Sequence, residues 1–261
     1  MDSNKRTEFF YDIFHASLPR LGPGEELSTQ KALDKLLSIR AQSADKPMSS
    51  KLRVLDIGCG NGTQTIQLAK HIDGTILAVD NHQPFLDELQ RRAEAEGVSD
   101  KIQPCLKDMR DLGLDDGSFD LIWSEGALYI MGCREGLVAC HSLLVPGGLM
   151  AVSELCWLRP DPPAECRQYF AKEYPPMTDI DTNLATIKSC GYEVVEHFTL
   201  PESAWLEPLY NPLEDRLRLL RKKYATDPER IEMIDSTQVE IDQYRKYSSY
   251  YGYVFYLMQR C

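Results

Sequence analysis

Two apolar runs that each end in an acid constrain the fold of this chain more than any other feature. Val54-Leu55-Asp56-Ile57 leads into glycines at positions 58, 60 and 62, and Ile76-Leu77-Ala78-Val79 ends at Asp80. An amphipathic run lies between them. A buried strand, a glycine turn, a helix and a second buried strand form a βαβ unit with parallel strands. In such sheets, ligands bind just beyond the carboxyl ends of the strands.

The alternation of strands and helices continues along the chain. We predict strands at 53–57, 74–79, 102–106, 120–124, 149–154, 192–199 and 250–258. We predict helices at 29–43, with Ser28 as the N-cap, and at 64–71, 84–96, 134–144 and 182–190, and a helical run over 207–236. A Pro-Gly-Gly turn at 146–148 should separate the fourth helix from the next strand. This rhythm indicates an α/β, doubly wound, mostly parallel sheet with helices on both faces.

The composition excludes several classes of protein. The 261 residues carry a formal net charge of -11, which disfavours a nucleic-acid partner because phosphate backbones are repelled. No apolar run approaches the roughly 20 residues of a membrane span, and the N-terminus leads into no signal-like apolar region. We therefore expect a cytoplasmic protein. The eight cysteines form no Cys-x-x-Cys pair, and the five histidines are scattered, so no metal site is predicted.

The glycine spacing separates two kinds of nucleoside cofactor. A dinucleotide fingerprint is Gly-x-Gly-x-x-Gly. In this chain the third glycine comes one residue early, and Thr63 stands where the fingerprint needs Gly or Ala. Asp80, 18 residues after Gly62, is placed to accept hydrogen bonds from an unphosphorylated ribose diol.

With this acid-x-Gly-x-Gly-x-Gly pattern, the chain resembles the class I S-adenosylmethionine-dependent methyltransferases. Asp116–Ile122 and Leu144–Gly148 resemble the turns that precede two later strands of that family. The resemblance implies a seven-stranded sheet and S-adenosyl-L-methionine as cofactor, with S-adenosyl-L-homocysteine as product. It also implies that Asp56 lies near the ammonium group of the cofactor, Asp80 on the ribose, and Asp108 and Met109 at the adenine. The full set of implied cofactor-binding residues is Ser28, Thr29, Asp56, Gly58, Gly60, Asn61, Asp80, Asn81, Asp108, Met109, Ser124 and Glu125.

Two further segments resemble a bacterial, small-molecule-type subgroup whose substrates are largely unassigned. These are Gly22-Pro23-Gly24 before the Ser28-Thr29 helix start, and Ser124–Tyr129 after the fourth strand. By position, Ser28 and Thr29 would approach the cofactor carboxylate. Glu125 and Tyr129 are the candidate catalytic residues. A carboxylate at 125 could act as a base or orient an amine, or it could hold the glycine loop, and both readings stay open.

The function that follows is in-line SN2 methyl transfer to a nitrogen, oxygen or sulfur atom of a small molecule. The alternatives are a macromolecular or metalloid acceptor, or a non-catalytic cofactor-binding protein. We expect residues 1–45 to form a helical lid on a core at 46–261. An insert at about 158–180 and a helical segment at about 207–240 would contribute to the acceptor pocket. The sequence leaves a homodimer open.

Overall fold

A computed structural model describes residues 2–42 and 51–261, so the predicted boundary at 45/46 lies outside the described residues. Seven strands form one sheet in the order β3-β2-β1-β4-β5-β7-β6, with β7 antiparallel to both of its neighbours and the other pairs parallel. The strands are β1 (Leu52–Ile57), β2 (Gly74–Asp80), β3 (Ile102–Leu106), β4 (Phe119–Glu125), β5 (Leu144–Trp157), β6 (Tyr192–Thr199) and β7 (Tyr251–Arg260). The predicted fold class is confirmed.

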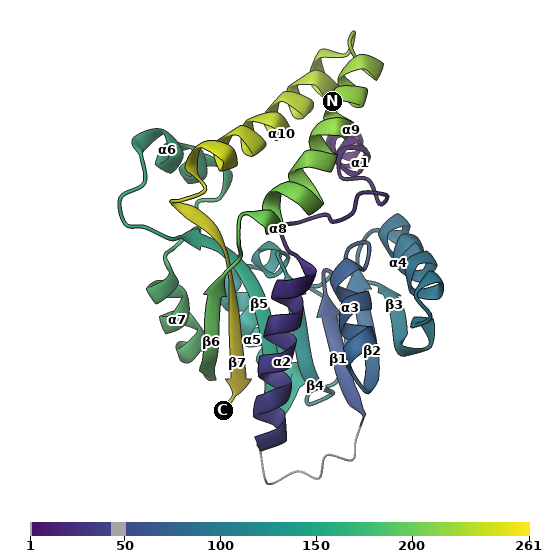
Figure 1. The fold of residues 1–261 in the computed structure, drawn as a ribbon, viewed down its shortest axis with the longest axis vertical. Coiled ribbons are helices and arrows are strands. Elements are labelled where there is room, and N and C mark those ends of the chain that lie inside the picture. Colours follow the sequence, from purple (N-terminus) through teal and green to yellow (C-terminus); the bar gives the residue numbers. More distant parts are fainter. Residues whose placement is uncertain (1, 43–50) are drawn as a thin grey trace.

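Helices cover both faces of this sheet (Figure 1). On one face lie α2 (Glu26–Gln42), α3 (Thr63–His71) and α4 (Gln83–Ala95), and their buried side chains belong to one apolar core. On the other face lie α5 (Cys133–Leu143) and α7 (Ile180–Ser189), which bury Leu137 and Ile187 in a second core. Short 3-10 turns at Ser99–Lys101 and Leu128–Met131 complete the α/β layer.

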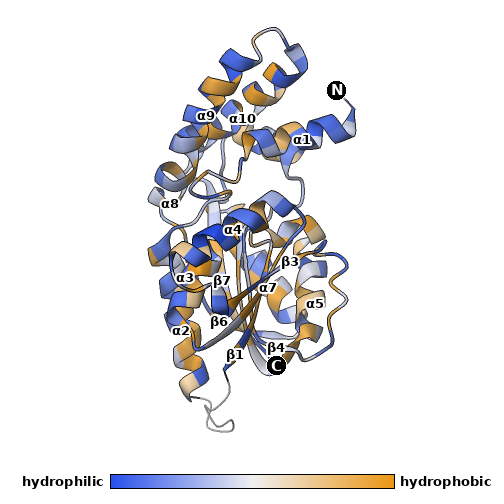
Figure 2. Cartoon of the chain, turned by 90° about the vertical axis from the view of Figure 1, so that its right-hand side faces the viewer, coloured by the Kyte–Doolittle hydropathy of each residue, from blue (hydrophilic) through white to orange (hydrophobic). Residues whose placement is uncertain are grey.

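A separate layer of helices stands over the carboxyl ends of the strands (Figure 1). It contains α1 (Ser3–Ile13), α6 (Ala164–Glu173), α8 (Ser203–Trp205), a π-helical turn at Leu206–Tyr210, α9 (Asn211–Lys223) and α10 (Pro228–Tyr247). Helix α1 packs against α9 and α10. Hydrophobic and hydrophilic residues alternate along α9 and α10 in Figure 2, as expected for helices with one buried face.

The structure corrects three local predictions. Ser28 is not an N-cap, because the helix begins two residues earlier, at Glu26, and Ser28 lies in its first turn. The run at 207–236 is not one helix, since Asp227 caps a new helix that starts at Pro228, where a missing N–H is tolerated. The Pro-Gly-Gly segment at 146–148 lies within β5, as an irregularity in its register with β4, and not in a separate turn.

Candidate active site

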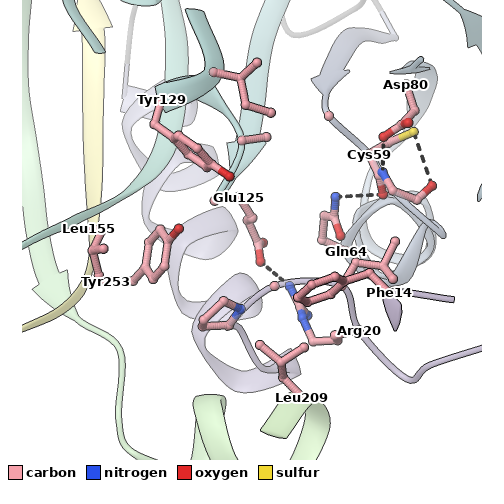
Figure 3. A pocket seen from close by; sticks show the side chains of 18 of the residues that line it. Phe14, Arg20, Cys59, Gln64, Asp80, Glu125, Tyr129, Leu155, Leu209 and Tyr253 are labelled. Atoms are coloured by element: carbon pink, nitrogen blue, oxygen red, sulfur yellow. Dashed lines mark hydrogen bonds and ion pairs between the residues drawn. The ribbon is translucent and has the colours of Figure 1, made fainter. Parts of the chain in front are cut away.

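A cavity of about 430 Å³ lies between the carboxyl ends of the strands and the upper helices. Its volume is typical of small-molecule sites. In Figure 3, Cys59 and Asp80 lie on one side of it and Tyr129, Leu155 and Tyr253 on the other, with Glu125 between them. The cavity therefore joins the predicted cofactor loop to the segments that were expected to bind the acceptor.

The glycine loop owes its shape to the absence of side chains. The φ angles of Gly58 and Gly60 are +70° and +54°, in the left-handed region that favours glycine. A Cβ on Gly58 would lie 2.3 Å from the Cβ of Ala127. The Gly58 N–H donates to the carbonyl of Val79 at 2.9 Å, which ties the loop to the end of β2. The loop backbone consequently stays open to the cavity.

Asp80 closes the other side of this loop. Its Oδ2 accepts a hydrogen bond from the Gly60 N–H at 3.0 Å, and its Oδ1 accepts one from the His82 N–H at 2.9 Å. A carboxylate has about four lone-pair sites, so it keeps capacity for two more donors such as ribose hydroxyls. Partial burial raises the pKa of Asp80 above its usual value. The carboxylate lines the cavity as predicted for a ribose partner.

Asp56 lies beneath the loop and is fully buried. Its Oδ2 accepts a hydrogen bond from Thr65 Oγ1 at 2.6 Å and a longer one from Gln64 Nε2 at 3.4 Å, while its Oδ1 has no partner. Burial, reinforced by the nearby charge of Glu125, raises the pKa of Asp56 to about 7. An unpartnered buried carboxylate oxygen is costly unless a ligand or a water satisfies it.

Five of the other predicted cofactor residues line the cavity, namely Asn61, Asn81, Asp108, Met109 and Glu125. The Asn61 side chain donates to the carbonyls of Ala16 and Leu18, at 3.0 and 2.7 Å, so it fastens the N-terminal segment. Asp108 is exposed, and its Oδ1 accepts the Arg110 N–H at 2.8 Å. Its contact with adenine stays a prediction.

Glu125 is the centre of a buried clamp. Its Oε2 pairs with the Arg20 guanidinium, and its Oε1 accepts hydrogen bonds from Thr29 Oγ1 at 2.8 Å and from Trp123 Nε1 at 2.9 Å. Figure 3 shows the Arg20–Glu125 contact at the cavity. Both carboxylate oxygens are thus engaged by the protein. The clamp holds the N-terminal segment over the site, which is a structural role and a poor starting point for a general base.

The side chains of Ser28, Thr29, Ser124 and Asp56 do not line the cavity. Ser28 Oγ donates to Glu25 Oε1, and Ser124 Oγ donates to the carbonyl of Ile57, at 3.1 and 3.0 Å. These hydroxyls are used to join α2 and β4 to their neighbours. The structure gives them supporting positions, and a direct contact of these four side chains with a cofactor stays a prediction.

Of the residues that build the far side of the cavity, only Tyr129 was a candidate from the sequence. We call this side the aromatic chamber; it is lined by Tyr129, Tyr174, Trp205, Tyr210, Tyr251 and Tyr253. Tyr129 lies edge-on to Tyr174 at 5.7 Å, and Trp205 lies 5.3 Å from Tyr253, measured between ring centres. Trp157, the last residue of β5, packs on Phe170. The chamber draws on four separate segments, so the usable signals in the sequence were Tyr129, which follows the fourth strand, and the tyrosine-rich C-terminal strand.

Comparison with known proteins relates the chain to methyltransferases. A family model described as "Methyltransferase domain" matches residues 54–148, which contain the glycine loop, Asp80, Asp108 and Glu125. Residues 54–148 are thus similar to a methyltransferase domain, in agreement with the resemblance that the glycine pattern indicated. The methyltransferase fold also covers nearly the whole chain in two solved structures. One is a SAM-dependent methyltransferase from Thiobacillus denitrificans, with 20% identity, a TM-score of 0.79, and coverage of 97% of this chain and 98% of the other. The second is YjhP from E. coli, with 21% identity, a TM-score of 0.75, and coverage of 97% and 100%.

Two curated methyltransferases are similar in sequence. A sterol 24-C-methyltransferase of Neurospora crassa is 28% identical over 180 residues, which are 65% of this chain and 47% of that protein. A 27-O-demethylrifamycin SV methyltransferase of Amycolatopsis mediterranei is 26% identical over 206 residues, which are 75% of this chain and 71% of that protein. The chain thus spans about half the length of the sterol methyltransferases that it matches.

Neither a membrane-spanning helix nor a metal-binding cluster occurs among the described residues, 2–42 and 51–261. No helix there is long and apolar enough to cross a membrane. No group of three or more histidine, cysteine or acidic side chains there is arranged to hold a metal ion. All eight cysteines of the chain lie in this part and are unpaired.

Proposed function

We propose that the protein transfers the methyl group of S-adenosyl-L-methionine to a small-molecule acceptor. The observation that carries this proposal is the single cavity that runs from the glycine loop and Asp80 to the aromatic chamber. Methyl transfer needs the donor and the acceptor in one water-poor space, and a continuous cavity under a helical layer provides it. Relatives named as sterol and rifamycin methyltransferases support an acceptor of low molecular weight.

The residues at the loop suit the cofactor. The open backbone at Gly58 and Gly60 would lie against its amino-acid end, and the free capacity of Asp80 would accept its ribose hydroxyls. The unpartnered Asp56 Oδ1, which lies beneath the loop, would accept a hydrogen bond from an ammonium group through water. The bound cofactor supplies a methyl group already activated by a sulfonium, so the protein needs no strong nucleophile of its own.

The protein's contribution is alignment and exclusion of water. The N-terminal segment is held over the loop by Asn61, by Glu125 through Arg20, and by Thr63 Oγ1, which donates to the Pro19 carbonyl at 2.7 Å. Leu21 of this segment lies against Gly60. We therefore propose that residues 2–25 act as the lid of the site, whereas α2, which was included in the predicted lid at 1–45, packs on the sheet. Tyr129, at the junction of the loop and the chamber, is the side chain best placed to orient an acceptor.

A macromolecular acceptor is the second candidate, and a label-transfer experiment separates the two. A cell extract is split by a 3-kDa filter, and each fraction is incubated with the protein and methyl-labelled S-adenosylmethionine. Label should appear in the small-molecule fraction, accompanied by S-adenosylhomocysteine. Label in protein or RNA, with none in the small molecules, would contradict the proposal.

A further inference from the structure

The aromatic chamber carries a carboxylate that the reasoning above does not use. Glu240 projects from α10 and lines the cavity. Its Oε1 accepts a hydrogen bond from the Tyr210 hydroxyl at 3.0 Å. In the part of the chain that the structure describes, no lysine or arginine forms an ion pair with it, and its charged neighbour is another acid, Glu173. Burial raises the pKa of Glu240, as expected for a carboxylate without a cation.

Glu240 faces the same space as the surrounding rings. Burial raises the pKa of Tyr129, Tyr169, Tyr251 and Tyr253, which stand on three other elements of the fold, and the negative charge of Glu240 adds to each shift. Glu240 and these four tyrosines line the same cavity.

The basic residues along the cavity are occupied elsewhere. Among the described residues that line it, only Arg20 and Lys107 are basic. Arg20 is paired with Glu125, and Lys107 Nζ donates to the Leu112 carbonyl near the exposed Asp108. The acids along the cavity outnumber these bases. The chamber is therefore a negatively polarised space with aromatic walls.

Such a space selects its ligand by charge. Aromatic faces attract an organic cation, and this attraction grows when water is excluded. A partly buried carboxylate disfavours an anion, and it stays uncompensated beside a neutral ligand. Resting on the proposed function, we propose that the acceptor carries an ammonium group, which is anchored by Glu240 within the aromatic chamber. This arrangement predicts that an organic cation binds more tightly than its neutral analogue.

Two ligands of nearly equal shape test the inference by calorimetry. 2-Phenylethylamine is a cation at pH 7.5, whereas 2-phenylethanol is neutral, and phenylacetate adds an anion. Each is titrated into the full-length protein saturated with S-adenosylhomocysteine, so that no turnover occurs. We expect the amine to bind at least tenfold more tightly than the alcohol, and phenylacetate to bind more weakly than either.

The variants are Glu240→Gln and, as a matched control, Glu232→Gln at an exposed position of the same helix. Glu240→Gln should remove the preference for the amine while leaving the affinity for the alcohol and for S-adenosylhomocysteine unchanged. Glu232→Gln should leave all three affinities unchanged.

The outcomes distinguish this inference from the proposed function. Normal binding of S-adenosylhomocysteine with no preference for the amine would overturn the ammonium anchor alone. A preference that survives Glu240→Gln would overturn the role of Glu240. Failure of S-adenosylhomocysteine to bind at all would overturn the proposed function itself.

Discussion

The buried pair of Arg20 and Glu125 should be a major stabilising contact between the N-terminal segment and the sheet. The two side chains are only 7% and 2% exposed. Removing one partner of a buried pair typically costs about 3–5 kcal/mol, because the other charge is left without compensation. In Arg20→Met the carboxylate keeps its Thr29 and Trp123 donors, so we expect the lower end of that range, about 3 kcal/mol. Glu125→Gln leaves a buried guanidinium without its carboxylate and should cost about as much.

The double variant decides whether the pair acts as a unit. If it does, the loss in Arg20→Met/Glu125→Gln should fall about 2–3 kcal/mol short of the sum of the single losses. Urea denaturation followed by circular dichroism gives the four free energies of unfolding. The exposed pair Arg218–Asp215, at 74% and 67% exposure, is the matched control and should show a coupling of about 0.5 kcal/mol or less. Equal coupling in the two cycles would refute the reasoning.

Two further predictions follow from the same structure. Gly58→Ala should lower the free energy of unfolding, measured by urea denaturation, more than Gly97→Ala does. Both glycines have φ near +70°, but only at position 58 would a Cβ collide with Ala127. Equal losses in the two variants would contradict this reasoning. Glu154 is buried, with its Oε2 unpartnered, and burial raises its pKa to about 7. The native state therefore holds its proton more tightly than the unfolded state, and this residue's contribution to stability falls as pH rises from about 4.5 to 7. The stability of Glu154→Gln relative to the unsubstituted protein should accordingly increase between pH 5 and pH 8, by at most about 3 kcal/mol; a difference that does not change with pH would contradict the shift.

Local sequence patterns were sufficient to predict the central sheet and the cofactor side of the site. Asp56 and Asp80 lie at the carboxyl ends of β1 and β2, which are parallel neighbours. Pairing of these two strands therefore brings both acids to the same edge of the sheet, independently of the other segments. The sequence likewise indicated the C-terminal strand, because its tyrosine-rich run is strongly strand-like, but not its antiparallel place between β5 and β6.

The acceptor side depends on contacts between distant segments. Arg20 meets Glu125 across 105 positions of sequence, and Glu240 meets Tyr210 only because α9 and α10 fold back over the sheet. Because Glu240 belongs to a charged amphipathic run, the sequence favours a solvent-exposed position for it. Its position at the cavity follows only from the placement of α9 and α10 over the carboxyl ends of the strands.

Titration of the protein with S-adenosyl-L-methionine and with NAD tests the central claim most directly. The account predicts binding of S-adenosylmethionine, and at least tenfold weaker binding in Asp80→Ala through the loss of charge-assisted hydrogen bonds. Asp100→Ala, at an exposed position, should bind as the unsubstituted protein does. Binding of NAD without binding of S-adenosylmethionine, or an unchanged affinity in Asp80→Ala, would contradict it.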